Sequence, residues 1–182
     1  MNIAPIQMVE LVYRKLFVEV DLDRFQPTTD ARDAHALLEN VALKTQVTCA
    51  ALDQEDRRGT PHFVTLRVQI DNEVRDGEPN QRMSPYLLDV EAGAVIILSH
   101  GAEKLGPPED LIAVNGPALI WGSIREQVAA MTARMPAGTA ILPSVNFHDL
   151  KKSHREKAAE VTTEASTDQG SGKPKRSRAK KS

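Results

Sequence analysis

The sequence predicts an α+β domain, in which a run of strands comes first and helices follow and cover the sheet. Early segments alternate apolar and polar residues with the period of a strand, and a later segment repeats apolar residues with the period of a helix. The connections at 53–60 and 71–84 are polar and contain glycine, as hairpin loops do. The strands they join should therefore pair antiparallel and leave one face of the sheet free.

Four strands are expected from the alternation, although the first is less regular than the other three. They lie at 12–20, 43–51, 64–70 and 86–94. In the first strand, Leu16, Val18 and Val20 fall on one side, which is the side expected to be buried. These segments predict a four-stranded antiparallel sheet with helices packed on one face.

Two helices are expected after the strands. Pro107 to Asp110 predicts the start of a short helix, and Gly116-Pro117 predicts that this helix stops and a second one begins. Pro136 and Gly138 are expected to end the second helix. Its apolar stripe, with steps of three or four residues, consists of Ile120, Ile124, Val128, Met131 and Met135. Such a stripe packs a helix against a sheet.

Charge is distributed unevenly along the 182 residues. Residues 1–150 hold 13 basic and 21 acidic residues, whereas residues 151–182 hold 10 basic and 4 acidic residues. From His154 onward the chain has no periodic apolar face, so a disordered basic tail is expected at 154–182, after a folded domain at 1–153. The tail could contact nucleic acid, an anionic surface or an acidic partner, or it could only aid solubility or fold weakly back on the acidic body. No aromatic residue interleaves its charges, which argues against a single-strand-binding platform and against nucleic acid as the main partner.

The compartment is predicted from what the chain contains. Its one cysteine, Cys49, has no internal partner for a disulfide, which favours a reducing compartment. No apolar run reaches the roughly 20 residues that span a membrane. We expect a cytoplasmic protein that does not insert into membranes. Cys49 lies in the middle of a predicted strand, where a buried and inert thiol is expected.

Reaction chemistry is not indicated by any motif. His148, Asp149 and His154 do not have the spacing of a zinc site. The acidic residues at 53–56, followed by Arg57 and Arg58, are typical of a solvated turn, and no phosphate-binding glycine loop is present. The sequence predicts a binding protein without catalytic residues, metal or cofactor.

Short sequence words then resemble the SecB family, the bacterial protein-export chaperones and their SecB-like relatives. The resemblance covers about residues 9–150 and is most specific at 115–150. Its words are Ile124-Arg125-Glu126, Met131 to Arg134 and Leu142-Pro143-Ser144-Val145-Asn146-Phe147, with weaker support from Phe63 to Val68 and from Tyr86 to Val90.

The resemblance implies a SecB-like four-stranded antiparallel sheet with helices on one face. It also implies a homotetramer, built as a dimer of dimers. Such a protein holds unfolded client chains without ATP and passes many of them to the SecA translocase motor. Other SecB-like relatives protect the antitoxin of a toxin–antitoxin pair, and the sequence does not separate the two roles. The basic tail departs from the short polar or acidic end of the export chaperone.

Candidate client-binding residues are Phe17, Phe63 and Leu87, because the other residues on the same strand faces are mostly polar. For each, an ordinary contact between subunits is the alternative. Trp121, at the edge of the helix stripe, is a further client-binding candidate, with a core or interface position as its alternative. Met131 and Met135 could form an adaptable surface, but their spacing favours core packing.

The SecA-docking candidates lie on the strand predicted at 86–94. In the SecB family an acidic residue just after an aromatic-Leu pair lies on the motor-docking face, and the matching residue here is Asp89, with Leu87 beside it. Glu91 is added because it points the same way on an alternating strand.

Overall fold

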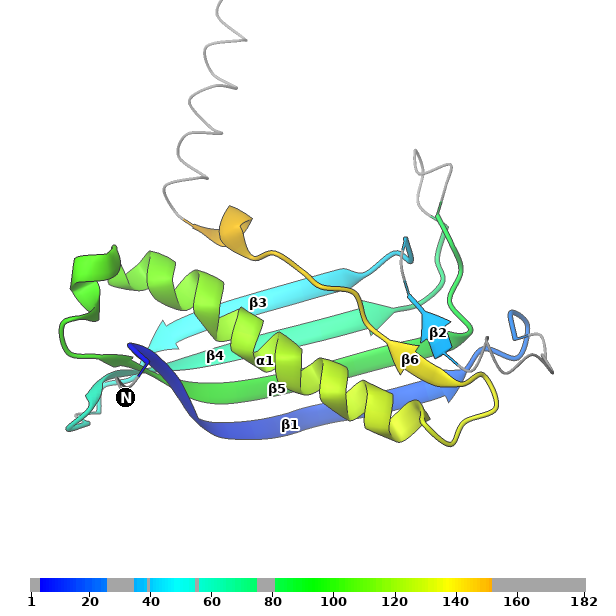
Figure 1. Ribbon diagram of the computed structural model, residues 1–182, viewed down its shortest axis with the longest axis horizontal. Helices are drawn as coiled ribbons and strands as arrows, with labels where there is room; N and C mark the ends of the chain where they lie inside the picture. Colours follow the sequence, from blue (N-terminus) through cyan, green and yellow to red (C-terminus); the bar gives the residue numbers. More distant parts are fainter. Residues whose placement is uncertain (1–3, 26–34, 39, 55, 75–80, 152–182) are drawn as a thin grey trace, which may run out of the picture.

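In the computed structural model, a four-stranded antiparallel sheet carries one long helix on one face (Figure 1), which confirms the predicted fold class. The structure describes residues 4–25, 35–38, 40–54, 56–74 and 81–151. The elements are β1 (Ile6–Val20), β2 (His35–Leu37), β3 (Lys44–Ala51), β4 (Gly59–Ile70), β5 (Tyr86–Ser99), η2 (Ala102–Leu105), α1 (Pro108–Thr132), β6 (Thr139–Ile141) and η3 (His148–Leu150).

The sheet has the order β1-β5-β4-β3. The two predicted hairpins are confirmed, because β3 pairs antiparallel with β4 and β4 pairs antiparallel with β5. The first strand closes the other side of the sheet by pairing with β5, and its register shifts between Met8 and Glu10 and again between Tyr13 and Lys15. The four predicted strands are therefore present, and β1, β4 and β5 are longer than expected.

The hydrophobic core lies between the sheet and α1. Alternate residues of the two central strands point into it, and α1 meets them with one apolar stripe. The buried residues are Val64, Leu66, Val68 and Ile70 on β4, Tyr86, Leu88, Val90, Ala92, Ala94, Ile96 and Leu98 on β5, and Ile112, Ile120, Ile124 and Val128 on α1.

The prediction of two helices was wrong, because α1 runs without a break through Gly116 and Pro117. Both residues are buried between the helix and the sheet. Gly116 allows this close approach, since a Cβ placed there would lie 3.0 Å from Cγ2 of Val64. Proline in a helix interior removes one backbone hydrogen bond, and α1 nevertheless continues through the buried Pro117.

The helix also ends earlier than predicted, at Thr132 rather than near Pro136. The buried Thr132 hydroxyl donates to the carbonyl oxygen of Val128 at 2.7 Å and accepts from the backbone N–H of Ala140 at 2.8 Å. This pair of bonds joins the end of α1 to β6. Met135 is therefore outside the helix, but it still packs against the core, as expected.

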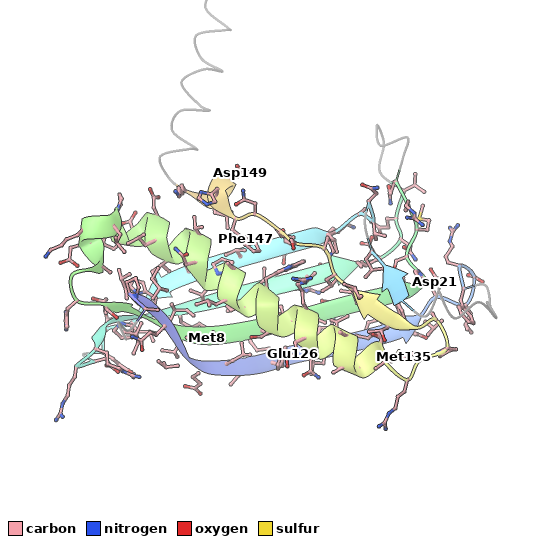
Figure 2. All side chains as sticks on the ribbon, in the orientation of Figure 1. Met8, Asp21, Glu126, Met135, Phe147 and Asp149 are labelled. Atoms are coloured by element: carbon pink, nitrogen blue, oxygen red, sulfur yellow. The ribbon has the colours of Figure 1, made fainter. Side chains whose placement is uncertain are left out.

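The chain then returns alongside α1 toward the start of the helix (Figures 1 and 2). β6 first pairs in parallel with β2. Beyond it, the carbonyl oxygen of Leu142 accepts from Nε of Arg125 at 2.9 Å, and the ring of Phe147 meets Trp121 edge-on at 6.2 Å between centroids. Figure 2 labels Met135 and Phe147 near the two ends of this returning segment. The predicted tail at 154–182, with His154, lies outside the described residues, and so does Glu55.

Candidate functional site on the open face of the sheet

The sheet has a second face, opposite α1, which we call the open face. Strand residues alternate between the two faces, so the neighbours of the core residues on β4 and β5 point to the open face. Phe17 on β1 lies opposite Asp89 in the register and shares this face. Phe17, Phe63, Leu87, Asp89 and Glu91, all predicted as binding residues, are therefore on one surface.

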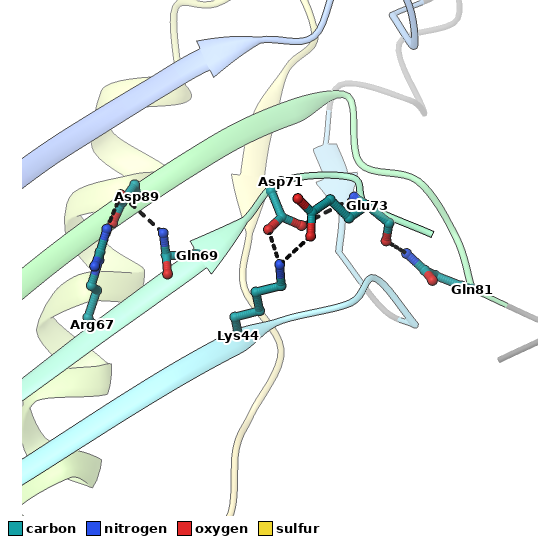
Figure 3. A network of polar contacts seen from close by, with 7 residues as sticks. All are labelled: Lys44, Arg67, Gln69, Asp71, Glu73, Gln81 and Asp89. Atoms are coloured by element: carbon teal, nitrogen blue, oxygen red, sulfur yellow. Dashed lines mark hydrogen bonds and ion pairs between the residues drawn. The ribbon is translucent and has the colours of Figure 1, made fainter. Parts of the chain in front are cut away.

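The centre of the open face is a belt of ion pairs that joins Lys15 and Arg67 to Asp89 and Arg14 to Glu91. Figure 3 shows the contacts of Asp89 with Arg67 and Gln69. Arg67 on β4 binds the Asp89 carboxylate with two nitrogens, Nε at 2.8 Å and Nη2 at 2.7 Å. Lys15 on β1 donates to the same carboxylate at 2.5 Å, and Nε2 of Gln69 donates at 3.2 Å. Asp89 thus joins three neighbouring strands through one carboxylate.

The belt neutralises the acidic residues that it contains. The hydrogen bonds from Arg67, opposed in part by burial and supported by Lys15, hold the pKa of Asp89 well below its usual range. Glu91, two residues further along β5, pairs with Arg14 at 3.0 Å. Asp89 and Glu91 do point the same way, as predicted, but both charges have partners within the chain.

One end of the open face holds a shallow cavity of about 350 Å³ beside the belt. Phe17 and Leu87 form part of its apolar lining, and Lys15 and Asp89 of the belt also line it. The complete lining is Lys15, Phe17, Gln69, Ile70, Asp71, Leu87, Leu88 and Asp89. Two of the predicted client-binding residues are therefore brought together.

At the other end of the open face, the ring of Phe63 packs against Gly93. A Cβ placed on Gly93 would lie 2.7 Å from Cζ of Phe63, so the ring lies directly over the glycine. Ile97 is only 1% exposed although it lies on this face and outside the core cluster. Phe63 and Ile97 therefore belong to a separate apolar patch, together with the half-buried Val95.

Among the described residues, the apolar regions at the two ends of the open face are separate. Val95, the β5 partner of Phe63, lies eight residues from Leu87, which is roughly 26 Å along an extended strand. The ion-pair belt lies between them. Trp121 is on the covered side, 4% exposed, and its Nε1 donates to the carbonyl oxygen of Pro143 at 3.0 Å. Trp121 is therefore a core residue, and its place among the client-binding candidates was wrong.

The edge strand β1 carries exposed apolar side chains, of which only Phe17 was predicted. Val9, Val12, Leu16 and Phe17 are 40%, 43%, 43% and 41% exposed. Leu16 does share a side with Val18 and Val20, as predicted from the sequence, because the three pair with Val90, Leu88 and Tyr86. It remains exposed because β1 is the edge strand of the sheet. Sequence alternation gives the face of a residue but not the distance of its strand from the centre of the core.

The hairpin between β4 and β5 is held by a second polar cluster (Figure 3). Lys44 on β3 bridges the carboxylates of Asp71 and Glu73, and its distance to Glu73 is 2.6 Å. Nε2 of Gln81 donates to the backbone carbonyl oxygen of Glu73 at 2.8 Å. These bonds fix the end of the sheet beside the cavity.

Cys49 was expected to be buried, and that expectation was wrong, because Cys49 is exposed on the edge strand β3. Partial desolvation by neighbouring atoms still raises the pKa of its thiol. The predicted surface turn is confirmed at Asp56, whose carboxylate binds Arg58 at 2.8 and 2.9 Å. Those bonds lower the pKa of Asp56 to about 2.

Two further findings concern the described residues as a whole. They contain no group of three or more His, Cys, Asp or Glu side chains placed to hold a metal ion. None of their helices combines the length and apolar character needed to cross a bilayer.

The class defined by this geometry is an α+β domain with one covered and one open sheet face. No protein-family model matches the sequence, and no curated protein matches it. A Streptococcus agalactiae protein of unknown function has a similar structure, with a TM-score of 0.46 and 9% identity over 77% of this chain and 97% of that chain. The Mycobacterium tuberculosis SecB-like chaperone Rv1957, solved with a ChAD peptide from the HigA1 antitoxin, gives a TM-score of 0.33 and 13% identity over 78% of this chain and 91% of that chain. The chain is thus distantly similar in structure to a SecB-like chaperone.

Proposed function

We propose that the protein is an ATP-independent holdase that binds unfolded polypeptides through exposed apolar surface. The observation that carries the proposal is the set of exposed apolar side chains on the edge strand β1. Val12 and Phe17 lie on the open face, Leu16 lies on the covered side and Val9 lies at the first register shift, and each is at least 40% exposed. Large apolar side chains gathered on one element mark an interaction surface. Burial against them is worth about 25 cal/mol per Å² before the costs of association, and it makes little demand on the sequence of the client.

The sequence segments that resemble SecB form part of the hydrophobic core, and they do not form the proposed binding surface. Ile124, Leu142 and Phe147, which belong to the most specific words, are all buried between α1 and the sheet or the returning segment. They specify how the helix and that segment pack. Client binding is assigned here to β1 and to the cavity lined by Phe17 and Leu87.

The test is suppression of aggregation by the purified full chain, with a chemically denatured client protein and no nucleotide. We expect light scattering of the client to fall as the protein is added. If a several-fold molar excess leaves the scattering unchanged, the holdase proposal is overturned. Mass measurement in solution tests the associated expectation of a homotetramer.

Between the two SecB-like roles, one observation favours a dedicated client, such as an antitoxin, over delivery to SecA. Asp89, the predicted docking charge, is used within the chain by Arg67 and Lys15. Titration of the SecA motor against the protein and against Asp89→Asn tests docking through this residue. Motor binding that weakens in the variant supports the export role. The dedicated role is supported if the protein does not bind the motor and if its gene lies beside a toxin–antitoxin pair.

The basic tail offers a different class of function, a nucleic-acid-binding adaptor. The tail lies outside the described residues, so this alternative rests on composition alone. Truncation after Ser153 should abolish any salt-sensitive binding of DNA or RNA if the tail is responsible. Unchanged binding after truncation, or none in the full chain, rejects the alternative.

A further inference from the structure

The two edge strands of the sheet differ in regularity. On β1 the register shifts twice, near Val9 and near Arg14. Bulges of this kind twist an edge and discourage pairing with another chain. On the opposite edge, β3 pairs with β4 through eight consecutive residues without a shift. The edge of β3 is therefore the more regular template for another strand.

The register identifies the backbone groups on the free edge of β3. The N–H of Leu52 donates to the carbonyl oxygen of Pro61 at 3.0 Å, one step beyond the pairing of Ala51 with His62. In antiparallel strands, the residues that bond to a given neighbour alternate along the strand. Even-numbered residues therefore bond to β4, and the outward backbone groups belong to Thr45, Val47, Cys49 and Ala51.

This edge lacks the features that usually block strand addition. Because β3 is the last strand in the order, no other strand of the described chain lies against it. Thr45, Cys49 and Ala51 are exposed, small and uncharged. The one lysine, Lys44, stands at the end of the strand and is tied to Asp71 and Glu73. Natural edges are commonly guarded by charge, proline or a covering segment, and the central part of β3 carries none of these among the described residues.

We infer that the free edge of β3 captures an extended polypeptide segment of a client as an additional strand. This inference deepens the proposed holdase function and rests on it for the identity of the partner. Four outward N–H groups and four outward carbonyls repeat at the spacing of a strand, and only another extended backbone matches them. Such recognition is independent of side-chain sequence, which suits a protein that binds unfolded chains.

A second copy of the protein is the less suitable occupant of this edge. Pairing two β3 strands would bring together segments in which six of the eight side chains are threonine, valine, cysteine or alanine. A stable dimer buries about 800 Å² on each partner, and such small side chains supply little of that area. A client segment needs only transient capture, and its alternate side chains would lie beside Val47, Cys49 and Ala51.

The first test compares Cys49→Pro with Cys49→Ala in the full chain. Proline removes the outward N–H of Cys49 and leaves the bonds to β4 intact, whereas alanine keeps that N–H and serves as the matched control. The probe is a fluorescent peptide of alternating threonine and valine with lysine at each end. We expect about tenfold weaker binding in Cys49→Pro, from the loss of one or two backbone hydrogen bonds. Equal affinity in two folded variants overturns the inference.

The second test does not depend on folding of the proline variant. The same peptide, N-methylated at its central residues, keeps its side chains and loses the N–H groups that would pair with β3. We expect its affinity for the unaltered protein to fall about tenfold or more. Binding that is insensitive to N-methylation overturns the inference.

The two tests separate this inference from the holdase proposal. If the unaltered protein suppresses aggregation but Cys49→Pro and N-methylation change nothing, the holdase proposal stands and capture by β3 fails. If the protein does not suppress aggregation yet binds the unmodified peptide through an N–H-dependent contact, the holdase proposal fails and the edge site stands.

Discussion

On β4, the side chains that point toward α1 differ from those that point away in size, polarity and partner. Val64, Leu66 and Val68 are fully buried against the helix. Between them, Thr65 and Arg67 face the open side, where Arg67 binds Asp89. The same strand thus supplies a stabilising face and a face whose central contacts are polar.

The two faces of the sheet are stabilised in different ways, and only the covered face has a hydrophobic core. On the covered face, order comes from close packing of apolar side chains, which is worth about 1.5–3 kcal/mol for each large residue buried. On the open face, the Asp89 carboxylate links β1, β4 and β5 through directional hydrogen bonds and exposes little apolar area. Larger apolar side chains are found at the two ends of that face and on the edge strand β1.

The largest expected effect belongs to the covered face. Ile124→Ala removes a fully buried side chain of α1 and should lower the free energy of unfolding by about 2–5 kcal/mol. The matched change is Leu16→Ala, on the same side of the sheet but 43% exposed, for which we expect a loss below about 1 kcal/mol. Denaturant unfolding measures both, and equal losses would contradict the division between core and edge.

The next effect concerns the belt on the open face. Asp89→Asn keeps the shape of the side chain and removes its charge, and it should cost about 1–3 kcal/mol through weaker hydrogen bonds to Arg67 and Lys15. Because the pKa of Asp89 is lowered by folding, the unfolded chain takes up the proton first as the pH falls.

The pH dependence of that effect has a definite sign. The contribution of Asp89 is complete above the carboxyl's unfolded pKa of about 3.9. It is lost as the pH falls through that value toward the lower folded pKa. The difference in unfolding free energy between the protein and Asp89→Asn should therefore shrink below about pH 4. A difference that stays constant from neutral pH to pH 3 would show that the negative charge of Asp89 adds no stability.

A smaller effect on stability is expected at Gly116, the glycine of α1 that packs against the covered face. Gly116→Ala places a methyl group 3.0 Å from Cγ2 of the fully buried Val64. We expect a net loss of about 1 kcal/mol, because crowding in the core outweighs the gain of about 1 kcal/mol in helix propensity. In a Val64→Ala background the crowding is relieved, and the same change should be stabilising. Additive effects in this double-mutant cycle would contradict the close packing of Gly116.

The smallest effect on stability is expected at Phe17, in the proposed client-binding surface. Phe17→Ser should change the free energy of unfolding by less than about 0.5 kcal/mol, because the ring lies on the surface. It should nevertheless weaken client binding about fivefold, through the loss of roughly 1 kcal/mol of apolar contact. Aggregation assays on the folded variant measure this loss. Full protection by Phe17→Ser would remove Phe17 from the client-binding surface.

Sequence reasoning predicted the covered face well, because burial on that face imposes a strict alternation. Val64, Leu66 and Val68 could be assigned from their period alone, and so could the stripe of Ile120, Ile124 and Val128 on the helix. The continuity of α1 could not be predicted, since Gly116 and Pro117 normally interrupt a helix and are tolerated here only through tertiary packing.

The open face was predicted less completely because its arrangement depends on pairing between distant strands. Alternation placed Phe63 and Leu87 on one face, but only the register shows that they stand at opposite ends of it. The exposure of Cys49 has a related cause, because strand order decides which strand is an edge. Trp121 was ambiguous in sequence, and its contacts with Pro143 and Phe147 place it in the core.

The pairing of β1 with β5 has a consequence for synthesis of the chain. All of β2, β3 and β4 lie between these two strands in the sequence. β1 therefore cannot pair within the sheet until β5 has been synthesised. Pairings between distant segments form late and slow the folding of a domain. During translation, β1 and its apolar side chains leave the ribosome long before β5 exists. Until β5 has been synthesised, β1 is therefore the kind of unpaired apolar segment that the finished protein is proposed to hold.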